Sequence, residues 1–231
     1  MPADLIQTVS SFMALGGPVV ALLVVLSVFA FALILLKLVQ FWRERVGRHG
    51  RARRALSAWQ KGDKGAARAL VADDRAPVSA AIATAMKMFA SGQTSRNLIE
   101  AEVARVAGAR LHDLQRGFRA LDAVSQVAPL LGLFGTVLGM IEAFRKLQEA
   151  GNAVDPSLLA GGIWVALLTT ATGLAIAMPV SLILAWFETR LENERVEIET
   201  LTGALLNGTE SQTSAEPQAD VLAAGNPSHA H

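Results

Sequence analysis

Three long apolar blocks alternate with polar and charged segments along the chain. The first covers residues 18–39 and has no charged side chain before Lys37. The second covers residues 123–141, and the third, residues 158–187, has no charged side chain at all. About twenty largely apolar residues in a helix span a bilayer, so each block predicts a membrane-spanning helix. We therefore predict an all-α integral membrane protein with three transmembrane helices, two of which extend into a cytoplasmic helical region.

The distribution of charge predicts which way these spans point. Residues 42–119 hold sixteen Lys or Arg against seven Asp or Glu, whereas residues 188–231 hold two against eight. Lys and Arg accumulate in cytoplasmic loops, so the middle segment is expected inside the cell and the N-terminus outside. We predict an external N-terminus (1–17), span 1 (18–41), a cytoplasmic helical loop (42–121), span 2 (122–146), a short external loop (147–157), span 3 (158–187), a cytoplasmic C-terminal helix (188–207) and a disordered tail (208–231).

A secretory signal peptide is an alternative interpretation of the first block. A signal peptide needs a positive region before its apolar core. Here the only charged side chain before the block is that of Asp4, while Arg43, Arg45 and Arg48 follow the block. We therefore favour a membrane anchor.

The sequence of the cytoplasmic loop predicts several helices separated by helix-breaking residues. Short helices are expected over residues 51–71, broken near Gly62 and Gly65, and another from Pro77 to Phe89. From Thr94, apolar residues recur every three to five positions, which is typical of an amphipathic helix. No proline separates this helix from the second span, so we expect one long helix that enters the membrane near Asp122.

Small residues recur every three or four positions in the second and third spans. Such stripes let membrane helices approach closely, so we interpret them as helix-packing surfaces. Pro129 and Pro179 remove backbone hydrogen bonds and are expected to kink the helices. The glycines of the two stripes are Gly132, Gly135 and Gly139 in the second span and Gly162 and Gly173 in the third.

Four threonines lie among these stripes and leave two interpretations open. Each hydroxyl can bond back to a carbonyl of its own helix, or the group can line a narrow wet path for ions. The spans hold no ionisable residue near their middle, whereas a proton path normally needs one. A partner chain would therefore have to supply it. The candidate pore-lining threonines are Thr136, Thr169, Thr170 and Thr172.

Other classes of function have little support. Cysteine is absent and no nucleophile–base set, metal cluster or phosphate-binding loop stands out, so we expect no enzyme, no bound metal and no cofactor. The basic segment has few aromatic residues and no recognition motif, so we favour contact with anionic lipid over nucleic acid.

Two motifs resemble those of the MotA/TolQ/ExbB proton channel family. The run Ala128–Val137, continued by Gly139-Met140-Ile141, is similar to the family's second-span signature, and Gly162-Ile163 with Ala166–Ala171 is similar to its third span. Size and topology favour the ExbB/TolQ branch. The resemblance implies that Thr136 and Thr170 face the pore. It also implies that the family's usual glutamate position is Val165 here.

The resemblance further implies an assembly and a task. It implies a homo-oligomer, expected to be a pentamer, in the inner membrane of a Gram-negative cell. The oligomer would enclose an ExbD- or TolR-like subunit whose single span carries the proton-binding aspartate, and would pass motion to a TonB- or TolA-like protein. The alternatives are a stator of the same family for another envelope machine, a non-conducting membrane scaffold, and, least supported, a small secondary transporter.

Overall fold

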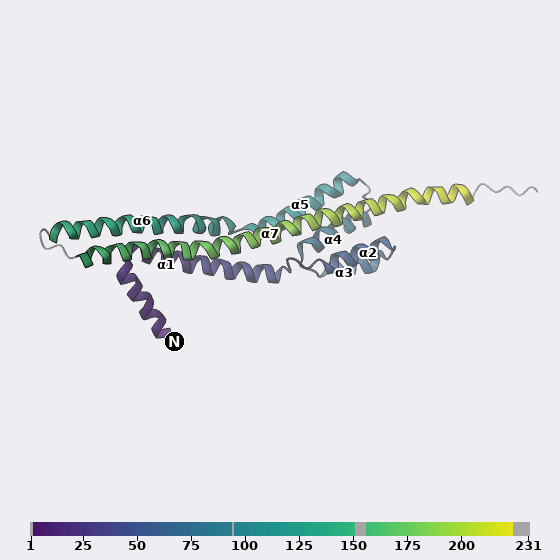
Figure 1. Cartoon of the computed structure of the whole chain (residues 1–231). Helices are drawn as coiled ribbons and strands as arrows, with labels where there is room; N and C mark the ends of the chain where they lie inside the picture. The colour runs from purple at the N-terminus through teal and green to yellow at the C-terminus, as the bar shows by residue number, and fades with distance from the viewer. Residues whose placement is uncertain (1, 94, 151–155, 224–231) are drawn as a thin grey trace, which may run out of the picture. The chain divides into compact units, whose positions relative to one another are not determined.

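The computed structural model describes residues 2–93, 95–150 and 156–223, and all of its elements there are α-helices. They are α1 (Pro2–Arg43), α2 (Gly50–Gln60), α3 (Lys64–Ala72), α4 (Pro77–Ala90), α5 (Arg96–Gln115), α6 (Phe118–Ala150) and α7 (Pro156–Ala223) (Figure 1). The chain divides into two compact units. Unit 1 comprises Met1–Val39 and Arg116–Phe187, and unit 2 comprises Gln40–Gln115 and Glu188–His231.

Unit 1 contains the apolar parts of α1, α6 and α7. Three helical stretches of the described chain are long and apolar enough to cross a membrane, namely Gly17–Arg43, Arg96–Glu149 and Leu159–Gly208. The prediction of an all-α protein with three such helices is confirmed. The three helices meet in a small core made of Val19 and Leu23 from α1, Ala128 from α6 and Ala177 from α7.

The ends of the spans differ in places from the predicted boundaries. Residues before Gly17 are helical, and α1 bends at Gly17 (φ 64°, ψ −163°), directly before Pro18. The helix α7 continues through residues 208–223, where the polar composition predicts disorder; a long helix can extend into such a sequence because each added residue gains one hydrogen bond. The described residues do not include 151–155 of the predicted external loop, 224–231 of the tail, or Thr94, where the amphipathic helix is expected to begin.

The expected single helix from the cytoplasmic loop into the second span is interrupted. The helix α5 ends at Gln115 and α6 begins at Phe118. Gly117 has a φ of +88°, which a residue with a Cβ rarely adopts. Its carbonyl accepts the first backbone bonds of the new helix, from the N–H groups of Ala120 and Leu121. A glycine therefore ends the helix here, in a stretch that contains no proline.

Unit 2 packs α2 to α5 around the part of α7 that follows Phe187. Its core brings Trp59 of α2 and Ile82 and Met86 of α4 together with Leu205 of α7. The ring centroids of Trp59 and Phe89 lie 6.1 Å apart. The helix predicted from Pro77 to Phe89 matches α4, and the helix expected after the third span is the continuation of α7. A buried apolar cluster of this kind holds the short helices in place, since they are too short to be stable alone.

Candidate functional site: the contact between two membrane-spanning helices

Within unit 1, α6 and α7 approach so closely that only glycine fits at several positions. A Cβ on Gly132 would lie 2.9 Å from the carbonyl oxygen of Thr169, and one on Gly139 would lie 3.0 Å from the Cβ of Ala166. A Cβ on Gly173 would lie 2.5 Å from the carbonyl oxygen of Ala128. Backbone atoms cannot yield as side-chain ends can, so these glycines set the distance between the two helices.

The remaining two glycines of the predicted stripes lie at the same contact. A Cβ on Gly135 would lie 2.7 Å from Oγ1 of Thr169, and one on Gly162 would overlap the Cβ of Ala143. The structure thus brings all five glycines together along one seam, which we call the small-residue seam. The glycines, Ala128, Ala143, Ala166 and Thr169 make up this seam.

Two threonines of α7 have hydroxyl oxygens within hydrogen-bond distance of a carbonyl across the seam. Oγ1 of Thr169 lies 3.2 Å from the carbonyl oxygen of Gly132 and 2.7 Å from that of Ala166. Oγ1 of Thr170 lies 3.1 Å from the same Gly132 oxygen. The carbonyl of Gly132 is reachable only because this residue has no side chain. Two hydroxyls on one carbonyl were not anticipated from the sequence, since spacing within each helix says nothing about the register between them.

The other two threonines have hydrogen bonds only within their own helices among the described residues. Thr136 donates to the carbonyl oxygen of Leu133 at 2.7 Å, and Thr172 donates to that of Leu168 at 2.7 Å. A threonine hydroxyl that donates its only proton still has lone pairs that can accept a hydrogen bond. Back-bonding therefore leaves each oxygen able to accept from water or from a protonated group.

Burial separates the four threonines into two kinds. Thr169 is only 2% exposed and is a packing residue of the seam. Thr136, Thr170 and Thr172 are half-buried. Only these three keep an accessible edge on which a hydrogen-bonded path could run.

Broad apolar faces flank the seam on both helices. Trp164 on α7 is 68% exposed, and Val165 beside it is half-buried. Pro129 and Pro179 both lie within continuous helix, in α6 and α7 respectively. The exposed apolar faces of α6 and α7 can contact lipid or further transmembrane helices. The other exposed large apolar residues include Leu130, Leu133, Phe134, Val137, Ile141 and Phe144 on α6, and Leu167, Leu174, Met178, Leu182 and Trp186 on α7.

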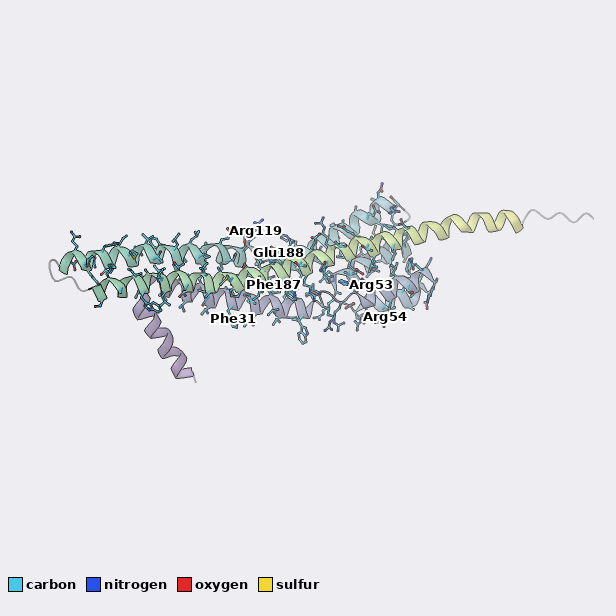
Figure 2. The ribbon with its side chains drawn as sticks, viewed as in Figure 1. Phe31, Arg53, Arg54, Arg119, Phe187 and Glu188 are labelled. Atoms are coloured by element: carbon cyan, nitrogen blue, oxygen red, sulfur yellow. The ribbon has the colours of Figure 1, made fainter. Side chains whose placement is uncertain are left out.

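A buried cation lies at one end of the span of α1. Lys37 is 7% exposed, and its Nζ lies 5.7 Å from the centroid of the Phe118 ring. Phe118 in turn stacks on Phe187, with ring centroids 5.8 Å apart (Figure 2 labels Phe187). Its long aliphatic stem lets lysine place a charge near a span end in this way. Lys37 lies near the break at Gly117, whose added Cβ would be 3.4 Å from the lysine Cε.

The opposite end of α6 carries exposed ion pairs. Arg145 lies 2.7 Å from Glu142 and 3.8 Å from Glu149, and Lys146 lies 3.8 Å from Glu142. These pairs are one helical turn apart and are exposed, so they contribute little to stability. Between them and Asp122 the sequence of α6 has no ionisable side chain, and α7 has none before Glu188. The seam itself can accept and donate hydrogen bonds but cannot hold a proton on a titrating group.

Comparisons with known proteins agree with the resemblance described above. Residues 73–200 match the model of the MotA/TolQ/ExbB proton channel family, a stretch that includes both motifs. The chain belongs to this family. Together with the three apolar helices, this makes it a multi-pass inner-membrane protein.

Individual relatives share the ExbB name. A protein of Methanothermobacter thermautotrophicus, named as a homolog of the biopolymer transport protein ExbB, is 37% identical over 125 residues, or 54% of this chain and 43% of that protein. The biopolymer transport protein exbB1 of Vibrio cholerae is 46% identical over 68 residues, or 29% of this chain and 30% of its own length. The ExbB protein of Pseudomonas putida is 28% identical over 102 residues, covering 44% and 31%. The matches thus span less than half the length of these relatives.

Proposed function

We propose that this chain is an ExbB/TolQ-like subunit of an inner-membrane motor driven by the proton-motive force. In this proposal several copies, five by the family resemblance, surround the helices of an ExbD- or TolR-like subunit. The N-terminus is periplasmic and the C-terminus cytoplasmic. The motor energises a TonB- or Tol-dependent envelope process such as outer-membrane import, through a TonB- or TolA-like protein and without an enzymatic step of its own. Membership of the family and the biopolymer transport names of the relatives support this assignment.

The observation that carries the proposal is a seam that is polar but cannot titrate. Half-buried Thr136 and Thr170 keep hydroxyl oxygens at its edge, while the centres of both helices lack any Asp, Glu, Lys, Arg or His. A proton path through a membrane needs an ionisable group. A partner carboxylate moving past these hydroxyl oxygens would meet acceptors that stabilise its protonated form. The exposed apolar faces beside the seam provide the surface on which such a partner helix would pack.

The test replaces the two hydroxyls by methyl groups. Thr136→Val and Thr170→Val preserve side-chain volume, so we expect the oligomer to assemble while proton-gradient-driven work is lost. Thr200→Val is the control for loss of a threonine hydroxyl outside the seam: Thr200 donates to the carbonyl of Val196 in its own helix, at 2.8 Å, and lies on the cytoplasmic part of α7. Proton flux would be measured in liposomes containing the subunit and its co-purified one-span partner. Full flux in both seam variants would refute the pore assignment.

A stator of the same family for a different envelope machine is the second candidate, favoured by Val165. Where the family usually has a glutamate, this chain has a half-buried aliphatic residue beside exposed Trp164. Loss of an acid at that position changes the charge that a moving partner meets. Identifying the envelope process that fails when the chain is deleted decides between the two, and Val165→Glu tests whether the acid is tolerated.

A non-conducting scaffold is the third candidate, because all four threonine hydroxyls donate to carbonyls inside unit 1. A scaffold would retain its function in both valine variants, and it would conduct no protons in the presence of any one-span partner. Co-purification of a partner whose span contains an aspartate counts against the scaffold.

A further inference from the structure

A buried carboxylate in unit 2 joins the segment after α1 to the cytoplasmic part of α7. The side chain of Glu194 is 0% exposed. Its Oε1 accepts a hydrogen bond from the backbone N–H of Gly47, and Nε2 of His49 lies 2.8 Å from the same oxygen. Its Oε2 is also buried and has no hydrogen-bond partner within the described part of the chain. Among the described residues, one oxygen of this carboxylate therefore has two partners and the other has none.

The backbone around Gly47 is shaped to reach this carboxylate. Gly47 has a φ of +86°, and an added Cβ would lie 3.2 Å from Nη1 of Arg190. The left-handed conformation and the narrow space both favour glycine. The segment 44–49 is thus held closely against α7, with a backbone N–H and an imidazole both directed at Glu194.

A second carboxylate flanks the same imidazole. Oε2 of Glu197 lies 3.8 Å from Nδ1 of His49. Arg53, which extends from α2 (Figure 2), donates to Glu197 through Nε at 2.6 Å and Nη2 at 2.9 Å. These hydrogen bonds from Arg53 lower the pKa of the Glu197 carboxyl. Glu197 is therefore a fixed negative charge on one side of the imidazole, while Glu194 lies on the other.

The other charges nearby are engaged elsewhere or lie beside the loop. Arg45 and Arg51 lie 3.5 and 3.7 Å from Oδ1 of Asp74, whose Oδ2 accepts a hydrogen bond from the Ser79 hydroxyl. Arg190 borders Gly47. Arg53 forms an ion pair with Glu197 and so neutralises its charge. His49, whose Nε2 lies 2.8 Å from Oε1, is positioned to neutralise the Glu194 carboxylate.

The protonation state of His49 decides how many hydrogen bonds its imidazole can donate to the carboxylates of Glu194 and Glu197. A neutral imidazole has one N–H donor, so pairing Nε2 with Glu194 would leave a lone pair on Nδ1 facing the Glu197 carboxylate. A protonated imidazole donates from both nitrogens and adds the positive charge that a buried carboxylate requires. Histidine is the side chain that ordinarily exchanges its proton between pH 5 and 8.

We propose that His49 and Glu194 form a proton-sensitive latch, which holds the segment 44–49 against α7 when the imidazole is protonated and loosens when it is neutral. The latch would make this part of unit 2 respond to the pH of the solution around it. It is independent of the proposed proton path, because every group in it belongs to unit 2. A scaffold without any pore could carry the same latch.

Hydrogen–deuterium exchange of the full-length protein in lipid nanodiscs tests the latch. Exchange of the peptide containing Gly47 would be compared at pH 6 and pH 8, after correction for the intrinsic exchange rate. A hydrogen bond to a charged donor is stronger than one to a neutral donor, so we expect this peptide to open about fivefold more at pH 8. His49→Gln and Glu194→Gln should each abolish that difference.

The exposed histidine of α5 provides the matched control. His112→Gln changes the same residue type outside the cluster and should keep the wild-type difference between the two pH values. Equal exchange at pH 6 and pH 8 in the wild type would overturn the latch. So would a pH difference that persists in His49→Gln, which retains a side chain able to donate to Glu194 and is expected to fold.

Discussion

Gly173 on α7 is the position where a single methyl group would most directly disturb the small-residue seam. The change is Gly173→Ala. Its new Cβ would lie 2.5 Å from the carbonyl oxygen of Ala128 and 3.2 Å from the Cα of Gly132. Ordinary contacts begin at 3.4 Å, so α6 and α7 must separate locally by about 0.9 Å, which weakens the van der Waals contacts around the point of separation.

The expected cost follows from this overlap. Overpacking of a closely fitted contact costs about 1–3 kcal/mol, whereas replacing a helical glycine by alanine gains roughly 0.5–1 kcal/mol. We therefore expect a net loss of between about 0 and 2.5 kcal/mol. Gly161→Ala is the matched control on the same helix, because an added Cβ there meets nothing within 4 Å. Gly161→Ala should therefore show only the gain in stability from replacing a helical glycine by alanine. The difference in stability between the two variants then isolates the steric cost at Gly173.

The assay is unfolding of the full-length protein in mixed micelles by increasing SDS, followed by circular dichroism. The wild type, Gly173→Ala and Gly161→Ala would be compared at one protein concentration, with oligomer size measured in parallel so that loss of assembly is not counted as loss of fold. The reasoning fails if Gly173→Ala unfolds at the same SDS fraction as Gly161→Ala, since the two helices would then not be in the described contact.

Three further substitutions address other parts of the chain. Gly117→Ala forces a Cβ into a φ of +88° and should destabilise unit 1 by about 1 kcal/mol, measured as a lower Tm. Ile82→Ala empties a fully buried site in unit 2 and should cost about 2–5 kcal/mol in denaturant unfolding. Arg53→Ala should flatten the acid sensitivity of unit 2: the pKa of Glu197 is lowered by Arg53, so the stabilisation is present above the unfolded pKa of Glu197 and is lost as pH falls through its folded pKa. An unfolding midpoint that falls equally in wild type and Arg53→Ala between pH 6 and pH 3 would contradict this.

The sequence was sufficient for the helical class and for the number of spans. Long uncharged blocks leave few alternatives, because a backbone in hydrocarbon must satisfy its own hydrogen bonds. The spacing of glycines also indicated which helix faces are small. Where the sequence misled, the reason is local: Gly117 ends a helix through its backbone conformation, and a pattern of side chains does not report φ.

The hydroxyl groups illustrate what could not be predicted from spacing. All four threonines looked equivalent by depth and residue type. In the structure Thr169 is a buried packing residue, whereas Thr136, Thr170 and Thr172 keep partly exposed surfaces. The difference arises because the register between α6 and α7 sets which threonine faces the Gly132 carbonyl. That register depends on contacts between helices that are about forty residues apart in the chain.

The apolar blocks and the family motifs by themselves determined that this chain is a three-span helical protein of the proton channel family. Only the tertiary structure decided which small residues touch, which hydroxyls share a carbonyl, and that His49 and Glu194 lie 2.8 Å apart although 145 positions separate them. The physical reason is that hydropathy and helical period act within one segment, whereas close packing and buried charge pairs depend on distances between segments.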